Sequence, residues 1–253
     1  MSISTDPVAL IAFLLALVRA VIWVVVSPPF SSLPTPAMAK VGIAAALAML
    51  AVPTLEHGLL PLSTSALIGA LVVQVVMGFA LGMVTKTLFS AVEAAGGISD
   101  LFGGIVLPPS LDPLSQNQTP IIGTLYQAVA VALLFVTGGD LVLVHGFIES
   151  FSAVGMTMAS LGTISHVLSS DLSTFFVAML EMAAPVLMVL FAAQIVLGLL
   201  SKAAPQINVF LLGFPLQVFL VLLLAALAVK VLPSAVVNLL EKSVIDGARA
   251  LGG

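Results

Sequence analysis

Long apolar runs constrain this chain more than any other feature of its sequence. The run from Leu216 to Val229 contains no charged residue. It is longer than a strand of an outer-membrane barrel, which has about 9–11 residues of alternating polarity. Only 7% of all residues are charged, whereas a soluble domain has about 25%. The sequence therefore predicts an all-α integral membrane protein.

Six apolar segments are expected to form the helices of a polytopic protein. They cover residues 8–26, 40–52, 66–92, 121–151, 172–200 and 207–232. A straight span needs about 20 residues, so the second segment is short. Lys and Arg are equally numerous on the two predicted sides, so the positive-inside rule gives no orientation. Either the fourth segment breaks near Gly138-Gly139-Asp140 into two spans, or the chain is not a simple serpentine.

Three linkers separate these segments. Residues 27–36 hold four prolines and are expected to be extended and stiff, and residues 155–170 are rich in Ser, Gly and Thr. The middle linker, residues 96–120, mixes apolar residues with glycines and prolines. Irregular backbone is not tolerated against lipid, so this linker is expected to be buried in protein or to line a water-filled path. An apolar, flexible loop at membrane depth is suited to plug a pore.

Two charged residues lie within apolar segments. A charge at the centre of a bilayer costs about 2.5–3.5 kcal/mol, so Arg19 is expected to meet a structural partner such as a carboxylate or a helix C-terminus. The alternative is that Arg19 extends towards the end of its helix near residues 27–29. Glu181 precedes Pro185 by four residues. It is a candidate proton or ion site, or a buried charge paired across a helix interface, with Arg19 as one candidate partner.

Small residues and an amphipathic tail predict helix packing. The pair Gly78 and Gly82, and the stretch from Ala91 through Gly97, have the spacing that lets helices approach closely. Residues 233–253 place apolar side chains opposite polar ones at helical spacing, which predicts a short amphipathic helix.

Nothing in the sequence predicts catalysis or a cofactor. Cysteine is absent, and the three histidines have no ligand spacing. Asp100 and Asp112 flank a Gly/Pro loop within the middle linker, where loop capping explains them as well as acid–base chemistry does. The net charge is −4 and no basic stripe exists, so nucleic acid is not an expected partner. We expect no enzyme activity, no metal and no cofactor.

The stretch that joins the last two apolar segments carries a family resemblance. It resembles the signature of the FliR family of flagellar export-gate proteins, which is shared with the T components of virulence-type type III secretion. Arg19, the prolines at 28 and 29, and Lys40 fit the same pattern, as does Gly78-x-x-x-Gly82 leading to Leu111-Asp-Pro113. The signature residues are Gly198, Lys202, Pro205, Gln206, Asn208, Phe210, Gly213, Phe214 and Pro215.

This resemblance implies a core subunit of the flagellar type III export gate. The subunit would form, with P-type and Q-type subunits, a helical assembly around one closed pore for unfolded export substrates, with about one copy of this chain per complex. Further implied partners are the B-type and A-type membrane proteins of the export apparatus, and membrane lipid. The implied location is the bacterial inner membrane in the flagellar basal body, with much of the complex above the bilayer plane.

The resemblance also implies an internal organisation and a set of site residues. The single domain, residues 1–253, would have a P-like part over 1–171, a Q-like helical hairpin over 172–232 and the amphipathic tail over 233–253. Arg19, Lys40 and the signature residues would contact other subunits. The pore plug would consist of Phe102, Gly103, Gly104, Ile105, Val106 and Leu107.

Two alternatives stay open from the sequence. One is the equivalent T component of a virulence-type injectisome. The other belongs to a different class, a secondary transporter in which Arg19 and Glu181 form a site in the middle of the membrane. Transporters often show inverted repeats with broken helices in both halves, and no convincing repeat is present in this sequence.

Overall fold

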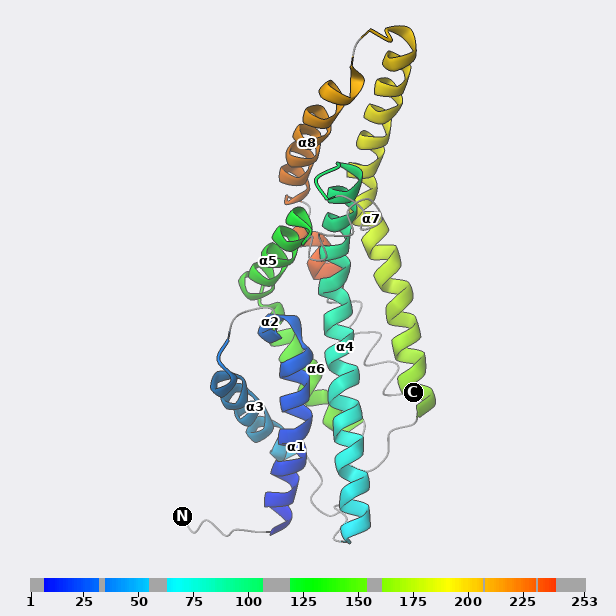
Figure 1. Ribbon diagram of the computed structural model, residues 1–253. Coiled ribbons are helices and arrows are strands. Elements are labelled where there is room, and N and C mark those ends of the chain that lie inside the picture. Colours follow the sequence, from blue (N-terminus) through cyan, green and yellow to red (C-terminus); the bar gives the residue numbers. More distant parts are fainter. Residues whose placement is uncertain are drawn as a thin grey trace. The chain divides into compact units, whose positions relative to one another are not determined.

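A computed structural model describes most of the chain as helix (Figure 1). The described residues are 7–31, 35–54, 63–106, 119–153, 161–206, 208–230 and 232–239. The described residues form helices and turns and no strand, which confirms the all-α prediction. By length and composition, four of the described helices can cross a membrane, or up to five if one bent pair counts as a span. The polytopic prediction is therefore also confirmed.

The helices follow one another along the chain with few long connections among the described residues. The elements are α1 (Pro7–Val26), α2 (Pro28–Ser31), α3 (Ala37–Ala51), the 3₁₀ turn η1 (Val52–Thr54), α4 (Thr64–Phe102), α5 (Ile121–Val136), α6 (Gly139–Ala153), α7 (Leu161–Ala203) and α8 (Val209–Ala228). Residues 232–239 are also helical.

The break predicted in the fourth apolar segment is confirmed. Helices α5 and α6 meet at an angle of 78°, and Gly138 between them has a φ of 73°. This left-handed conformation is costly for residues with a Cβ atom and is typical of glycine just beyond a helix end. Each half is shorter than a span of about 20 residues, so the pair is one broken span or a re-entrant segment rather than two spans.

All three predicted linkers are partly helical, which corrects their boundaries. Residues 28–31 of the first linker form α2. Residues 96–102 of the middle linker are the end of α4, and residues 161–170 of the third are the start of α7. Glycine, serine and threonine have low helix propensity but do not forbid a helix, because tertiary packing overrides a weak local preference. Residues 107–118 and 154–160 lie outside the described residues.

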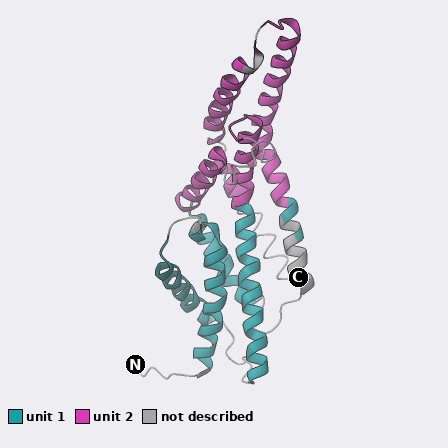
Figure 2. Cartoon of the chain, viewed as in Figure 1, with its two compact units in different colours: residues 1–88, 137–173, 240–253 teal, residues 89–136, 174–239 magenta. Residues whose placement is uncertain are grey.

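The chain consists of two compact units (Figure 2). Unit 1 comprises Met1–Leu88, Thr137–Ser173 and Leu240–Gly253, and unit 2 comprises Phe89–Val136 and Thr174–Leu239. Helices α4 and α7 therefore contribute to both units. The division into a P-like part, a Q-like hairpin and a tail follows different boundaries and stays a prediction.

Unit 1 is built on small residues that bring helices together. Ala12, Ala16 and Ala20 lie four residues apart on α1 and are fully buried, and α1 packs on α3. A Cβ atom on Gly78 of α4 would lie only 2.6 Å from the main-chain oxygen of Arg19 on α1. Such a distance is below van der Waals contact, so the predicted close approach through the Gly78 and Gly82 pair is confirmed.

Unit 2 contains the α7–α8 hairpin. Ser201, Lys202 and Ala203 belong to the last turn of α7, so this helix extends beyond the predicted apolar segment 172–200. The side chain of Asn208 caps α8 by accepting a hydrogen bond from the main-chain N–H of Leu211 at 3.4 Å. A helix N-terminus leaves such N–H groups without partners, and an Asn cap satisfies one of them.

The predicted amphipathic tail begins as a helix. In the helix at residues 232–239, Leu232, Val236 and Leu239 are buried, whereas Ser234 and Asn238 are exposed. The spacing of the buried residues is that of one helix face. The rest of the tail, residues 240–253, lies outside the described residues.

Candidate functional site

The predicted plug begins in a tight turn at the end of α4. We call residues 103–106 the α4 turn. The N–H of Gly104 donates to the oxygen of Leu101 at 3.2 Å, and the N–H of Ile105 donates to the oxygen of Asp100 at 3.0 Å. Gly104 has a φ of 69°. This pattern is a Schellman motif, in which a left-handed glycine ends a helix and satisfies its last carbonyl groups.

The α4 turn rests on the α7–α8 hairpin. A side chain at Gly103 would overlap Val221 of α8, and the nearest atoms to Gly104 belong to Phe214 and Gln217 of the same helix. The Gln194 amide on α7 donates to the main-chain oxygen of Phe102 at 3.3 Å. The turn is therefore seated against both helices of the hairpin, and Gly103 leaves no space for a larger residue.

The apolar side chains around this turn are only partly covered by the chain itself. Phe102 is 45% exposed, and Ile105 and Val106 are half-buried. Gly103 is buried against α8, as described above. Leu107, the last residue of the predicted plug, lies outside the described residues. The plug role of these residues stays a prediction, but the structure gives them a common and well-defined support.

Asp100 joins the end of α4 to the start of α5. Its Oδ2 atom accepts hydrogen bonds from the main-chain N–H groups of Ile122 at 2.9 Å and Gly123 at 3.2 Å. These N–H groups belong to the first turn of α5, where no residue of the helix itself can satisfy them. Asp100 is fully buried. Of the two roles considered from the sequence, capping is the one that the structure shows.

Glycines make this junction narrow. A Cβ atom on Gly96 would lie 2.7 Å from the main-chain nitrogen of Gly123. Two further bonds hold α5 in unit 2. Gln127 donates to Glu93 on α4 at 2.9 Å, and the Tyr126 hydroxyl donates to the main-chain oxygen of Ala225 on α8 at 3.4 Å. The predicted close packing of the small residues around Gly96 is confirmed.

Arg19 is the buried charge of unit 1. Its Nε atom donates to Gln74 on α4 at 2.7 Å, and one of its terminal nitrogens donates to the main-chain oxygen and hydroxyl of Ser150 on α6 at 3.0 and 3.2 Å. The guanidinium also lies 4.0 Å from the centre of the Phe151 ring. Arg19 is fully buried, so the alternative that it extends towards the helix end is wrong.

Glu181 was predicted to be a buried charge, and the structure places it on an exposed side of its helix. It is exposed on α7 in unit 2, so it is not a buried charge within the chain itself. Burial against another subunit stays a prediction. Among the described residues, no group of three or more His, Asp or Glu side chains could hold a metal ion.

Most of the described signature side chains lie on the surface of the α7–α8 hairpin. Lys202, Pro205, Gln206, Asn208, Phe214 and Pro215 are exposed. Gly198 is open on its outer side, whereas Gly213 is buried and would place a Cβ atom 3.2 Å from Leu197. Lys40 is half-buried on α3. Phe210 belongs to the first turn of α8, and its side chain lies outside the described ones.

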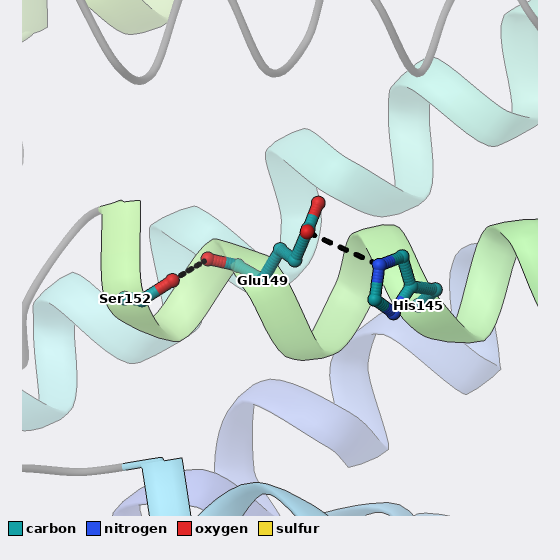
Figure 3. Close-up of polar contacts among 3 residues, drawn as sticks. All are labelled: His145, Glu149 and Ser152. Carbon is teal, nitrogen blue, oxygen red and sulfur yellow. Dashed lines mark hydrogen bonds and ion pairs between the residues drawn. The ribbon is translucent and has the colours of Figure 1, made fainter.

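Helix α6 carries a polar surface that the sequence did not single out. The Nε2 atom of His145 lies 3.1 Å from a carboxylate oxygen of Glu149, with both side chains more than half exposed (Figure 3). The hydroxyl of Ser152 donates to the main-chain oxygen of Glu149 at 2.7 Å. The exposed residues of the same helix also include Leu141 and Val142.

Sequence reasoning missed two sets of contacts at these sites. The capping of α5 by Asp100 was hidden because residues 96–102 were interpreted as linker, although a glycine pair follows Asp100 at a position suited to end a helix. The acceptors of Arg19, Gln74 and Ser150, are far apart in sequence. Only the charge of Arg19 within an apolar segment predicts a polar contact here.

Comparisons with known proteins find similar sequences over most of the chain. Residues 10–243 match the family of bacterial export proteins, family 1. The flagellar biosynthetic protein FliR of Bacillus subtilis is 27% identical over 220 residues, which is 82% of each chain. FliR of Escherichia coli is 28% identical over 86% of this chain and 84% of its own. The secretion system apparatus protein SsaT of Salmonella typhimurium is 25% identical over 62% of this chain and 61% of its own.

Proposed function

The chain belongs to the family of bacterial export proteins, family 1, and on that premise we propose that it is a core subunit of the flagellar type III protein export gate. It would form, with P-type and Q-type subunits, the closed pore through which unfolded substrates cross the inner membrane. The observation that carries the proposal is the match over residues 10–243, together with flagellar relatives that align over more than four-fifths of the chain.

The plug is assigned to residues 102–107 in this proposal. Support comes from the α4 turn, which fixes the chain against α7 and α8 while Phe102 stays 45% exposed. Apolar side chains on a narrow, glycine-lined support block ions without presenting a charge to them.

The signature residues are assigned to contacts with other subunits. Pro205, Gln206 and Phe214 lie exposed on the hairpin, where another subunit could reach them. A polar turn between two apolar helices is suited to a protein neighbour, because lipid cannot satisfy its main chain. Arg19 differs from this set, since it is buried within unit 1 and acts on the fold of the chain.

Partners and location follow from the same proposal. The chain would lie in the inner membrane as part of the flagellar basal body, next to the B-type and A-type proteins of the apparatus. Helix α7 has 43 residues, about twice the length that spans a bilayer. Much of it would therefore lie above the bilayer plane, packed on neighbouring subunits. No catalytic role, nucleotide or metal is part of the proposal.

Two measurements test the proposal. Co-expression with the P-type and Q-type subunits should give a stable complex that survives purification in mild detergent. Expression in a non-motile strain that lacks its own FliR should restore swimming. If neither complex nor motility is obtained while the chain is present in the membrane, the proposal fails.

A second candidate is the T component of an injectisome. The match to SsaT supports it, although that match covers 62% of the chain, against 82% and 86% for the flagellar relatives. Restored secretion in an injectisome strain without its T component, together with failure to restore motility, would favour this candidate. The transporter alternative has no such support, because none of the relatives reported above is a transporter, Arg19 is bonded to Gln74 and Ser150, and Glu181 is exposed.

A further inference from the structure

Helix α7 carries a single charge on an uncovered face in unit 2. Glu181 is the only charged residue from Leu172 to Ser201. Val177 lies four residues before it, and Pro185 and Met188 lie four and seven residues after it, so the four residues share one face of the helix. All four are exposed. We call this set, residues 177, 181, 185 and 188, the Glu181 stripe.

The chain itself offers the Glu181 carboxylate no counter-charge. Among the described residues, no Lys, Arg or His side chain lies within ion-pair distance of it. The buried side of α7 is made of Ala183, Val186 and Leu190, which lie on the opposite face of the helix. Any partner of Glu181 must therefore come from outside the described part of the chain.

Neither lipid nor water suits the Glu181 stripe. A bare carboxylate is costly in hydrocarbon, and charges within apolar helices are usually paired with other protein groups. In water, the apolar side chains around it would remain exposed, Met188 to 66%, and apolar surface in water is unfavourable in proportion to its area. A protein surface that supplies apolar contacts and one cation satisfies both parts of the stripe.

Pro185 narrows the chemistry of that cation. In an α-helix, each main-chain N–H donates to the oxygen four residues earlier, and proline has no N–H. Pro185 lies within α7, so the main-chain oxygen of Glu181 lacks its helical donor. Carboxylate and main-chain oxygen then need donors at the same position. A guanidinium has five donors in a rigid plane and is more weakly hydrated than an ammonium group, so arginine suits this position better than lysine.

We propose that the Glu181 stripe docks an apolar helix of another subunit, and that an arginine of this helix binds the carboxylate and the main-chain oxygen of Glu181. The contact rests on the export-gate function proposed above and adds the chemistry of one interface to it. Val177 and Met188 would exclude water on both sides of the pair. A charge-assisted hydrogen bond is stronger in such a dry environment.

Competition between two forms of the chain tests this contact. Wild type and variant carry different tags and are co-expressed with the P-type and Q-type subunits, and the amount of each tag in the purified complex is measured. Glu181→Gln is expected to enter the complex at least tenfold less than wild type, because it leaves a buried cation without its counter-charge. Glu149→Gln makes the same change at an exposed carboxylate of α6. It is the matched control and should compete equally with wild type.

The isolated chain separates docking from folding. Glu181 is exposed in the chain alone, so Glu181→Gln should have the same thermal denaturation midpoint in detergent as wild type. A lower midpoint, by as much as accounts for the loss of complex, would show that Glu181 acts on the fold of the chain and would overturn the docking contact.

A charge exchange identifies the cation. Glu181→Arg should be excluded from the complex. Each Lys and Arg in the apolar helices of the P-type and Q-type subunits is then replaced by Glu in turn, and one replacement should restore the entry of Glu181→Arg. Restoration at an arginine would support the proposal. Restoration at a lysine alone would show that the assignment of a guanidinium is wrong, and restoration at no position would overturn the pairing.

The remaining outcomes distinguish the docking contact from the function on which it rests. Failure of the wild-type chain to form any complex would overturn the export-gate proposal. Equal entry of wild type and Glu181→Gln into a complex that does form would overturn the docking contact alone. An equal deficit of Glu149→Gln would also contradict it, because the effect would then not depend on the Glu181 stripe.

Discussion

At the scale of single residues, Arg19 shows how an apolar chain carries a full charge. Its partners in unit 1 include the side-chain oxygen of Gln74 and both oxygens of Ser150, and the Phe151 ring lies against the guanidinium. Breaking a buried charged contact by removing one partner is strongly destabilising, because the other group is left buried without compensation. The same contacts tie α1 to α4 and α6, so this residue fixes three helices at once.

We predict that Arg19→Met lowers the free energy of unfolding by about 3 kcal/mol. Gln74→Leu should cost a similar amount, and the double variant should cost less than the two single effects together, because the residues share a bond. Trp23 is the only tryptophan, and it stacks on Phe147 in the same unit, so its fluorescence during denaturation in detergent reports the loss. Lys40→Met, at a half-buried position, is the control and should change the free energy of unfolding by less than about 0.5 kcal/mol. Equal effects of the two methionine substitutions would contradict this account.

At the scale of elements, helix α4 depends on glycine where it meets α1. A Cβ atom at Gly78 would lie 2.6 Å from a main-chain oxygen of α1, whereas a Cβ atom at Gly69 on the same helix meets nothing within 4 Å. We predict that Gly78→Ala destabilises unit 1 by about 1–3 kcal/mol through overpacking. Gly69→Ala should stabilise it by about 0.5–1 kcal/mol through helix propensity. Denaturation followed by Trp23 fluorescence compares the two, and a stabilising Gly78→Ala would show that α1 and α4 are not in close contact.

The hairpin offers a second pair of glycines with opposite surroundings. Gly213 faces Leu197 across the hairpin, and Gly198 meets nothing within 4 Å. We predict that Gly213→Leu destabilises the isolated chain by about 1–3 kcal/mol, which thermal denaturation in detergent can measure. Gly198→Leu should leave the isolated chain unchanged but reduce its recovery in complex with P-type and Q-type subunits. Normal recovery of the Gly198→Leu complex would show that this position does not face a neighbour.

Local sequence features predict some boundaries of these helices, whereas contacts between distant residues set others. The break between α5 and α6 was predictable because Gly138 and Gly139 interrupt an apolar run, and a local conformation at Gly138 produces it. The sequence predicts helix packing up to Gly97 but assigns residues 96–120 to a linker, whereas α4 continues to Phe102. The role of Gly96 and Gly97 is to admit α5, and a contact with Gly123, far along the chain, cannot be found from local propensity.

The sequence predicts which residues of the candidate site are unusual, but not which residues they contact. The sequence indicated a buried Arg19 from the cost of a charge in an apolar segment, but it could not name Gln74 or Ser150. It placed Asp100 at the edge of a loop, and only the fold shows that its carboxylate lies at the start of α5. The exposure of Glu181 also came from the fold, because a helix in an apolar segment has two sides and the sequence does not say which one is covered.

At the scale of the whole molecule, a large apolar surface is open on α7 and α8. Leu199 and Leu211 are 64% and 68% exposed. In this chain such surface is covered either by lipid or by other subunits. We predict that subunits cover it. A cysteine at either position, introduced into the cysteine-free chain, should react with a membrane-soluble maleimide in the chain alone and be protected in the complex. Leu190→Cys, at a fully buried position, is the unreactive control, and unchanged labelling of Leu199→Cys on assembly would show a lipid-facing surface.

The length of α4 and α7 has a consequence for the cell. With 39 and 43 residues and a rise of about 1.5 Å per residue, they are about 58 and 65 Å long. The hydrocarbon of a bilayer is about 30 Å thick, so we expect roughly half of each helix to lie outside it. A copy made without the proposed partner subunits would expose that half to water and would be a target for membrane proteases. The abundance of this protein is therefore expected to follow the supply of its neighbours rather than its own rate of synthesis.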